Sequence, residues 1–305
     1  MPLIRTVRRR RGAPASLRWR WVAVSVAALV ALVWWLPPLP GPRFLEMPPA
    51  PGSGFTPWRP LARGIDHASA NFTKPRPMRC EVLRLDLADT NLSFVVKPSN
   101  GGRPGETDSQ FPSSFVRANG LQAAVNTTPF SPVRHLPGRS LDLQGLAVSE
   151  GDRYSEAEPN LDSLVITRDN RARLVTAGDD TRDAWTGAGG FLISLRGGTN
   201  VAEELHPGPA TVIGLSGDAR WMFWLVVDGR EPRRSEGATP RETAEMLRRL
   251  GASHAINMDG GGSSTLAVGG GWKGARLLNR PSHWLLEGLE RPVGGLLGVR
   301  SKPLP

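Results

Sequence analysis

The stretch that decides the fold is residues 221–265, which read WMFWLVVDGREPRRSEGATPRETAEMLRRLGASHAINMDGGGSST. Its first seven residues are apolar without interruption, which predicts a buried strand at 221–227. Thr239 is then expected to be the N-cap of a helix, with Pro240 at its first position. Ala244, Leu247 and Leu250 form an apolar stripe, and Gly251 is expected to end the helix. A second strand is expected at 254–258. The stretch therefore reads strand, loop, helix, strand, which is typical of a βαβ unit.

Around this unit, the chain from residue 65 onward is dominated by short strand patterns. Apolar alternation and short apolar runs predict strands at 81–87, 92–97, 121–125, 145–149, 161–168, 171–176, 191–195 and 211–215. The pair at 161–168 and 171–176 is expected to form a hairpin across Asp169-Asn170. The predicted fold class is therefore α+β, with a mixed sheet of many short strands and few helices.

Two acidic residues follow the strands of the predicted βαβ unit. Asp228-Gly229 ends the first strand, and Asp259 ends the second. Because parallel strands end at one edge of a sheet, where open α/β sheets place ligands, the two carboxyl groups are expected to share a site. The three glycines after Asp259 favour an anion-binding nest of backbone N–H groups, to which Ser263 and Ser264 add hydroxyls. A structural glycine turn with a capping aspartate is the alternative reading.

Three further positions carry polar residues that suit a sugar phosphate. Asn126 follows a predicted strand, and its amide could hydrogen-bond a sugar hydroxyl or an oxyanion. Asn279-Arg280 and Glu290-Arg291 provide guanidinium groups, which bind phosphate through paired hydrogen bonds. Each of them alone fits an ordinary turn or a surface ion pair better than a binding site, so only their combination indicates a site.

These segments in this order resemble the phosphodiester glycosidase family. The resemblance rests on VDGREPRRSEGAT, a helix, INMDGGGSSTLAV, LLNRPS and LERPVGGLLGV, and it covers roughly residues 80–301. The family cleaves the bond between a sugar and the phosphate of a sugar-1-phosphodiester, and it includes bacterial proteins related to exopolysaccharide biosynthesis. The resemblance implies that Asp228 and Asp259 are catalytic and that the substrate is bound by Asn126, Gly229, Gly260, Gly261, Ser263, Ser264, Asn279, Arg280, Glu290 and Arg291.

The chain departs from the family pattern at two places. The family usually has Asn-Gly-Gly-Phe-Phe where residues 126–130 read NTTPF, and the loss of glycine reshapes the pocket near Asn126. It usually has Arg-Thr-Ala-Ile-Gly where residues 209–214 read PATVIG, and the missing arginine removes a phosphate contact.

The implied reaction is hydrolysis at the anomeric carbon with a phosphomonoester as the leaving group. Its transition state carries positive charge on the sugar ring, so Asp228 or Asp259 is expected to act as a base or nucleophile. Arg280, Arg291 and the glycine turn would hold the phosphate. No cofactor is required, and a divalent cation on the aspartates is compatible with this scheme. The alternative is a non-catalytic, membrane-anchored protein that binds polysaccharide and assists exopolysaccharide assembly or export. A serine hydrolase is disfavoured because the chain lacks the Gly-x-Ser-x-Gly elbow.

The N-terminal part predicts a membrane anchor. Residues 21–36 are apolar or small and uncharged, seven arginines lie within residues 1–20, and residues 37–64 form a Pro/Gly-rich linker. Such a charge distribution predicts a basic cytoplasmic tail, one span of a bacterial inner membrane, and a catalytic domain at 65–305 in the periplasm. A cleaved signal peptide is the alternative, although no small-x-small cleavage site follows the apolar run.

Composition excludes other classes of protein and site. The net charge is +10, but only +3 remains on the other 285 residues once the seven N-terminal arginines are removed, which argues against a nucleic-acid partner. Cys80 is the only cysteine, so no intrachain disulfide forms, and it is expected in the core. The five histidines lack metal-ligand spacing such as HExxH.

Overall fold

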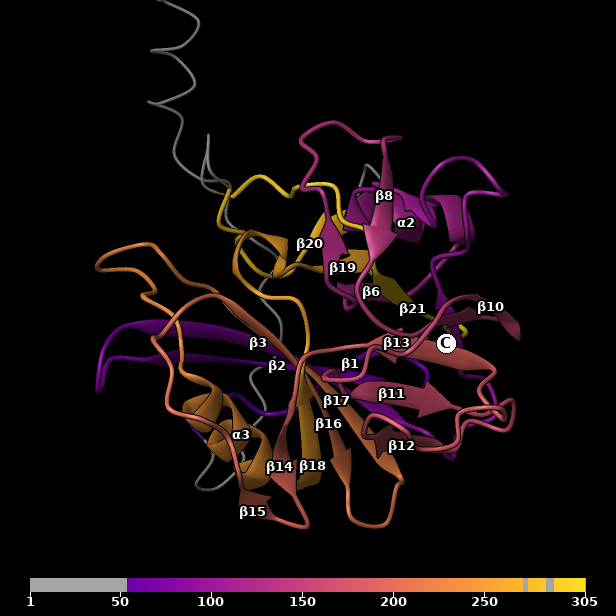
Figure 1. The fold of residues 1–305 in the computed structure, drawn as a ribbon. Helices are drawn as coiled ribbons and strands as arrows, with labels where there is room; N and C mark the ends of the chain where they lie inside the picture. Colours follow the sequence, from indigo (N-terminus) through magenta and orange to yellow (C-terminus); the bar gives the residue numbers. More distant parts are fainter. Residues whose placement is uncertain (1–53, 271–273, 284–287, 305) are drawn as a thin grey trace, which may run out of the picture. The chain divides into compact units, whose positions relative to one another are not determined.

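The computed structural model describes residues 54–270, 274–283 and 288–304, and Figure 1 shows their arrangement. The predicted anchor at 21–36 and its basic tail lie outside these residues. In the described ranges, no helix combines the length and the apolar character that a membrane crossing needs.

The described strands form four sheets. The largest has the order β1 (Arg59–Ala62), β2 (Ile65–Phe72), β3 (Met78–Asp86), β17 (Trp221–Val227), β16 (Ala210–Ser216), β18 (Ala252–Asn257), β14 (Ile193–Arg196), β15 (Thr199–Asn200). A second has the order β10 (Asp152–Ser155), β9 (Ala147–Ser149), β13 (Thr186–Gly189), β11 (Ser163–Ile166), β12 (Ala172–Val175). A third has the order β20 (Ala275–Leu277), β19 (Leu266–Gly269), β6 (Ala123–Asn126), β21 (Leu296–Arg300), β4 (Ser93–Val96). The smallest has the order β5 (Thr107–Asp108), β8 (Ser140–Leu143), β7 (Phe130–Ser131).

Helices are few, as the α+β prediction requires. The predicted helix is α3 (Pro240–Arg249), and its Thr239 hydroxyl and Glu242 carboxylate form a reciprocal capping box. The other α-helix of the described ranges is α2 (Pro112–Asn119), which ends at Gly120 in the left-handed conformation. A single 3-10 turn, η1 (Gly261–Ser263), follows Asp259. The sequence analysis did not predict α2, whose N-cap residue offers no capping side chain.

The sheet around β17 differs from the predicted βαβ unit in one respect. β16 lies between β17 and β18 and pairs antiparallel with both, so β17 and β18 run parallel without being hydrogen-bonded to each other. All strand pairs of the described residues are antiparallel. The prediction of a mixed sheet was therefore wrong, while the expectation that the two strands end at one edge was right.

The main core lies between the largest sheet and the two five-stranded sheets. Trp224 of β17 is fully buried there and meets Phe94 of β4 edge to face, with ring centroids 6.4 Å apart. A second core fills the space between the largest sheet and α3, where Leu247 packs near Leu225 and Cys80. These two cores hold β17 from both faces, which fixes the strand end that carries Asp228.

The folded domain begins earlier than the predicted residue 65. Phe55 is only 2% exposed and packs edge to face on Phe72, with centroids 5.9 Å apart. Strand β1 then pairs with β2. The C-terminal part of the segment expected to be a linker therefore belongs to the largest sheet.

Candidate active site

Asp228 lies where β17 ends and is buried, with 4% of its surface exposed. Its Oδ1 accepts hydrogen bonds from the Asn279 side-chain amide at 3.2 Å and from the Arg280 backbone N–H at 2.9 Å. Burial raises the pKa of Asp228 to about 6, although these hydrogen bonds and nearby Arg234 act in the opposite direction. The structure thus brings together three predicted site residues, but it leaves this carboxyl group little access to solvent.

Beside Asp228 lies a buried ionic network that the sequence analysis missed. Glu231 is 4% exposed, and its carboxylate pairs with the Arg234 Nε at 3.2 Å and the Arg280 Nε at 3.1 Å. Arg234 also lies 3.8 Å from the Asp228 carboxylate. Arg280, which was expected to hold phosphate, is therefore engaged by Glu231. The signal in the sequence was the density of charge in Asp-Gly-Arg-Glu-Pro-Arg-Arg directly after a buried strand.

Asp259 occupies the equivalent position after β18 but has different surroundings. It is partly exposed, and its backbone N–H donates to the Thr127 carbonyl at 2.8 Å. Burial raises the pKa of its carboxyl group, while a hydrogen bond with Ser263 and the charge of Arg291 lower it. The carboxyl group of Asp259 thus lies beside the Ser263 hydroxyl and within the influence of the Arg291 charge.

Asn126 holds the Asp259 turn in place from the neighbouring sheet. Its side-chain amide donates to the Asp259 carbonyl at 2.6 Å. Its side-chain oxygen accepts from the Thr211 hydroxyl at 2.7 Å and from the Thr265 N–H at 3.0 Å. Asn126 is fully buried, so the predicted contact with a sugar is replaced by a positioning role.

The glycine turn brings Arg291 close to Asp259. Gly261 has φ +60°, a conformation that favours glycine, and the η1 turn then buries Ser263. The Ser263 hydroxyl accepts hydrogen bonds from the Arg291 guanidinium at 3.2 Å and 2.5 Å. Arg291 also lies over the Phe130 ring, 5.7 Å from its centroid. These contacts confirm that the predicted turn and Arg291 meet.

A pocket of about 460 Å³ opens beside this turn and carries positive charge. It is lined by His135, Arg230, Gly262, Ser282 and Arg291, and no carboxylate lines it. We call it the anion pocket. Arg230 is exposed and has no ion-pair partner among the described residues. Burial lowers the pKa of Arg291, and the charge of Arg230 adds to this effect. Two guanidinium groups lining one pocket that has no carboxylate in its lining favour an anionic ligand.

Neither Arg230 nor His135 was predicted. Arg230 has φ +63°, which is uncommon for a residue with a side chain, and an added Cβ on Gly261 would lie 2.9 Å from its guanidinium. The His135 ring meets His283 at a centroid distance of 6.4 Å. In the sequence, Arg230 resembled an ordinary surface arginine, and His135 belonged to no motif. Only the turn at 228–230 could have indicated that Arg230 lies in a site.

A group of buried hydroxyls surrounds the Asp259 turn. The hydroxyls of Thr127, Thr128, Ser264 and Thr265 are buried and make no hydrogen bond to the described residues. Thr127 and Thr128 replace the two glycines of the family pattern, and Gly295 packs directly against Thr128. The departure noted in the sequence therefore fills space behind the turn and adds polar groups there.

Two predicted site residues have structural contacts instead. The Glu290 carboxylate accepts hydrogen bonds from the backbone N–H of Ser113, at 2.9 Å, and from its hydroxyl, so it caps the N-terminus of α2. Gly229 packs against the backbone of Gly208 and Pro209, where a Cβ would come within 2.5 Å of an atom. Glu290 was expected to bind the substrate, whereas in the structure its carboxylate contacts a helix end. Gly260 also adjoins this segment, since an added Cβ would lie 3.1 Å from the Pro209 carbonyl.

The described residues contain no group of three or more His, Cys, Asp or Glu side chains that could hold a metal ion. Asp228 has Arg234 and the acid Glu231 as its charged neighbours, and Asp259 has Arg291. The divalent cation considered from the sequence therefore has no ligand set in this part of the chain.

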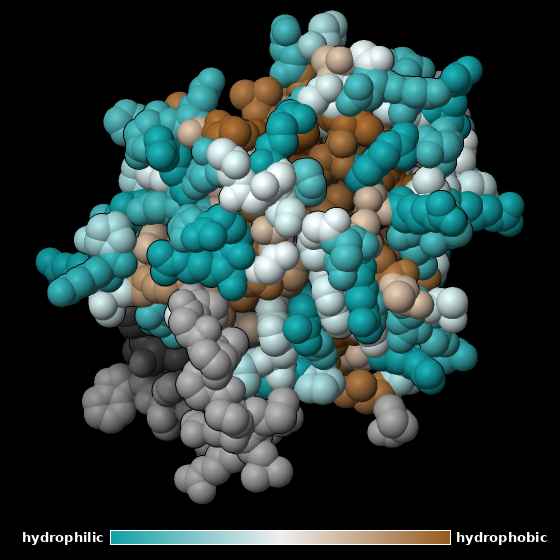
Figure 2. Space-filling view, turned by 90° about the horizontal axis from the view of Figure 1, so that it is seen from below, coloured by the Kyte–Doolittle hydropathy of each residue, from teal (hydrophilic) through white to brown (hydrophobic). Residues whose placement is uncertain are grey.

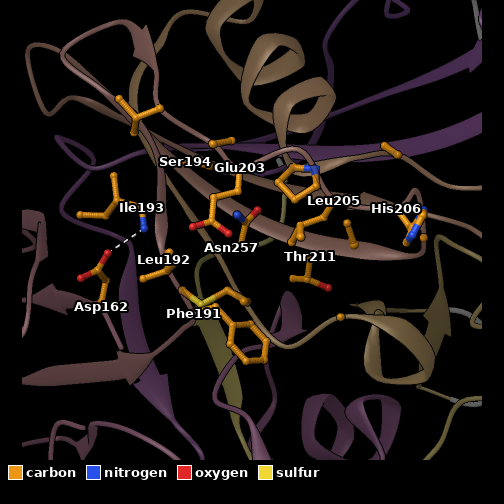
Figure 3. A pocket seen from close by; sticks show the side chains of 18 of the residues that line it. Asp162, Phe191, Leu192, Ile193, Ser194, Glu203, Leu205, His206, Thr211 and Asn257 are labelled. Atoms are coloured by element: carbon orange, nitrogen blue, oxygen red, sulfur yellow. Dashed lines mark hydrogen bonds between the residues drawn. The ribbon is translucent and has the colours of Figure 1, made fainter. Parts of the chain in front are cut away.

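A second cavity, of about 450 Å³, also borders the glycine turn, and Figure 3 shows its wall. Gly260 belongs to its lining, together with residues of β14 and β16. We call it the apolar cavity because exposed side chains such as Phe191 and Leu205 surround it. The candidate site thus consists of a carboxylate turn that borders both a cationic pocket and an apolar cavity.

Comparisons with solved structures identify similar folds. The catalytic domain of zebrafish N-acetylglucosamine-1-phosphodiester alpha-N-acetylglucosaminidase, auto-inhibited by its pro-peptide, superposes with a TM-score of 0.61 at 16% identity, over 80% of this chain and 85% of that one. A hypothetical protein from Synechocystis gives 0.56 at 13% identity, over 79% of this chain, which spans 62% of the Synechocystis chain. A putative exported protein from Burkholderia pseudomallei gives 0.52 at 14% identity, over 73% and 74%.

No curated protein matches the sequence. The family model described as phosphodiester glycosidase matches residues 119–300, which is more than half of the chain. The match includes both acidic strand ends, the glycine turn, Asn279 and Arg291. On this evidence the chain belongs to the phosphodiester glycosidase family.

Proposed function

We propose that this protein hydrolyses the bond between the anomeric carbon of a sugar and the phosphate of a sugar-1-phosphodiester. The observation that carries the proposal is the position of Asp259, whose carboxyl group lies near Ser263 and Arg291 beside a pocket with two arginines. The family assignment supports glycosidase chemistry in general, and the zebrafish relative acts, by its name, on a phosphodiester of N-acetylglucosamine.

The anion pocket suits the phosphate of such a substrate. Arg230 and Arg291 would place positive charge where negative charge develops as the carbon–oxygen bond breaks. Because these positive charges are already in position before the bond breaks, the phosphate can leave without a proton from a strong general acid. Arg291 fits this role better than Arg280, since a serine hydroxyl holds Arg291 whereas Glu231 already neutralises Arg280.

Asp259 would act on the sugar side of the same bond. In the transition state the anomeric carbon carries positive charge, which the nearby carboxylate stabilises. Water forms the new bond to this carbon and gives a proton to the carboxylate, while the electron pair of the broken bond stays with the phosphate. Alternatively, the carboxylate first forms a covalent bond to the sugar, which water then hydrolyses.

Asp228 is better placed to position the site than to touch the substrate. Its Oδ1 accepts from Asn279, and Asn279 also donates to the Ser264 carbonyl in the glycine turn at 3.0 Å. Asp228 would thus fix the turn through Asn279. We assign it as a positioning residue and Asp259 as the catalytic carboxylate.

The cellular setting remains part of the proposal. The charge pattern of residues 1–36 favours an inner-membrane anchor with the domain in the periplasm, and the natural substrates there would be envelope or exported polysaccharides that carry phosphodiester links. The second candidate is a non-catalytic polysaccharide-binding protein. The threonines at 127 and 128, which replace glycines of the family pattern, favour that candidate.

The test is to incubate the full-length chain with methyl esters of gluco, galacto and N-acetylated sugar-1-phosphates and to measure the free sugar released. Release by the wild type that is lost in Asp259→Asn, with an unchanged circular dichroism spectrum, would support the proposal. A folded wild type that releases no sugar from the whole panel but binds polysaccharide saturably would favour the non-catalytic candidate.

A further inference from the structure

The apolar cavity has a wall that is unusual for a sugar-binding site. Phe191 and Leu192 precede β14, while Val201 and Leu205 lie in the segment that follows β15. In Figure 3, Phe191 and Leu205 lie along the same cavity as Ser194 and Asn257. Polar side chains such as Asp162, Glu203 and Asn257 also line the cavity, but these large apolar side chains distinguish its wall from that of the anion pocket.

Its apolar residues are exposed rather than covered by other parts of the protein. Phe191, Leu192, Val201 and Leu205 are 40%, 47%, 48% and 56% exposed, and they are four of the eight large hydrophobic side chains exposed among the described residues. Figure 2 shows from below that apolar residues gather in patches between hydrophilic ones. A gathering of this kind in a hollow marks a binding site for apolar groups.

One polar group on the wall also lacks a partner. The Ser194 hydroxyl is buried, with 1% of the residue exposed, and makes no hydrogen bond to the described residues. An unpaired buried hydroxyl carries a free-energy cost that a ligand atom or water can remove. The cavity therefore suits an occupant that is mostly apolar and carries a polar atom.

The apolar cavity and the anion pocket border the same short turn. Gly260 lines the cavity, Gly262 lines the anion pocket, and Gly261 between them lies against Arg230. One ligand with an anionic group and an apolar group could therefore occupy both pockets, because both border residues 260–262. Both ends would lie next to Asp259.

We propose that the substrate is an amphiphile, and that the apolar cavity binds an alkyl chain carried by the alcohol on the far side of the phosphate. The inference rests on the proposed function and names its substrate class, a sugar-1-phosphate ester of a long-chain alcohol. The phosphate occupies the anion pocket, and the chain passes Gly260 to reach Phe191 and Leu205. The cavity of about 450 Å³ lies within the range of pockets that enclose small ligands.

The experiment uses two probes on the full-length chain. Decyl phosphate and ethyl phosphate, below the micelle concentration of the former, are titrated by calorimetry against the wild type, Leu205→Ser and Leu304→Ser. Leu304 is the matched control, because it is a leucine of similar exposure, 45%, that does not line the cavity. In parallel, kcat/KM is measured for the methyl and decyl esters of the same sugar-1-phosphate.

We expect decyl phosphate to bind at least about 30-fold more tightly than ethyl phosphate, since a fully buried methylene contributes a factor of about four. Leu205→Ser should reduce this ratio several-fold and Leu304→Ser should leave it unchanged. The decyl ester should have the higher kcat/KM in the wild type, and Leu205→Ser should reduce that preference.

The outcomes separate the two proposals. Hydrolysis of the methyl ester without any preference for the decyl ester, and with equal binding of both phosphates, overturns the alkyl site and leaves the glycosidase proposal standing. Tighter binding of decyl phosphate that depends on Leu205, without hydrolysis of either ester, supports the alkyl site and removes the catalytic proposal. A chain-length effect equal in Leu205→Ser and Leu304→Ser places the chain elsewhere and contradicts the inference.

Discussion

The two acidic strand ends occupy corresponding positions in the fold but are built for different purposes. Asp228 follows β17 and is buried, with protein donors on its carboxylate and the Glu231 network beside it. Asp259 follows β18 and is partly exposed between two pockets. Both sit beside glycines and both have raised pKa values. The difference lies in the partners of the two carboxyl groups: Asp228 is held by protein donors beside the Glu231 network, whereas Asp259 belongs to the turn that borders both pockets.

The largest expected effect is a contrast in activity between the two carboxylates. Asp259→Asn should lower kcat/KM by about 10³-fold or more, since it removes the charge that faces the sugar. Asp228→Asn should cost only about 10-fold, because an asparagine oxygen can still accept from Asn279. Steady-state kinetics on one sugar-1-phosphodiester would measure both, and melting curves would establish that both variants fold. Equal losses of kcat/KM in the two variants would contradict the assignment of different roles to Asp228 and Asp259.

The next largest effect distinguishes the arginine near each carboxylate, Arg291 near Asp259 and Arg234 near Asp228. Arg291→Gln should lower kcat/KM by about 10²-fold with little loss of stability, because its guanidinium faces the anion pocket. Arg234→Gln should do the reverse: activity changes little, and the free energy of unfolding falls by about 1 to 3 kcal/mol, because buried Glu231 and Asp228 lose a partner. Urea unfolding measured beside the kinetics distinguishes the two. A stability loss confined to Arg291→Gln would contradict this division.

The smallest effect concerns stability against pH. The pKa of Asp228 rises from 3.8 to about 6 on folding, so the fold favours the protonated form and loses stability as pH rises through that window. The full cost is about 3 kcal/mol above pH 6. Asp228→Asn removes the titrating group and should therefore be more stable than the wild type by about 1 to 3 kcal/mol at pH 7, with the advantage disappearing near pH 4. Unfolding curves at both pH values measure it, and an advantage that is the same at both would show that the charge of Asp228 is not its source.

Sequence reasoning succeeded where local chemistry decides the structure. The apolar run of β17, the capping box of α3 and the glycine turn after Asp259 are all set by residues close in the chain. Strands β19 and β21 escaped prediction because glycines interrupt their patterns. Gly298 of β21 has no side chain because Leu121 and Phe115 pack against it, which is a tertiary reason.

The site was predictable in its members more than in their roles. Asp228, Asn279, Asp259, Ser263 and Arg291 were expected together and are together. The insertion of β16 between β17 and β18, the capping of α2 by Glu290 and the place of Arg230 in the anion pocket all depend on contacts between distant segments. No local pattern carries that information, since a carboxylate that caps a helix and one that binds a ligand look alike in a sequence.

The position of β21 has a consequence for how the protein is made. Leu296 of β21 pairs with Asn126 of β6, so the two partners are 170 residues apart. At a synthesis rate of about 5–20 residues per second, β6 waits on the order of ten to thirty seconds on the ribosome before that neighbour emerges. During this interval the apolar edge of β6 is available to chaperones and to wrong partners. The residue that secures the Asp259 turn is therefore among the last to reach its final environment, and translation speed upstream of residue 300 becomes a determinant of yield.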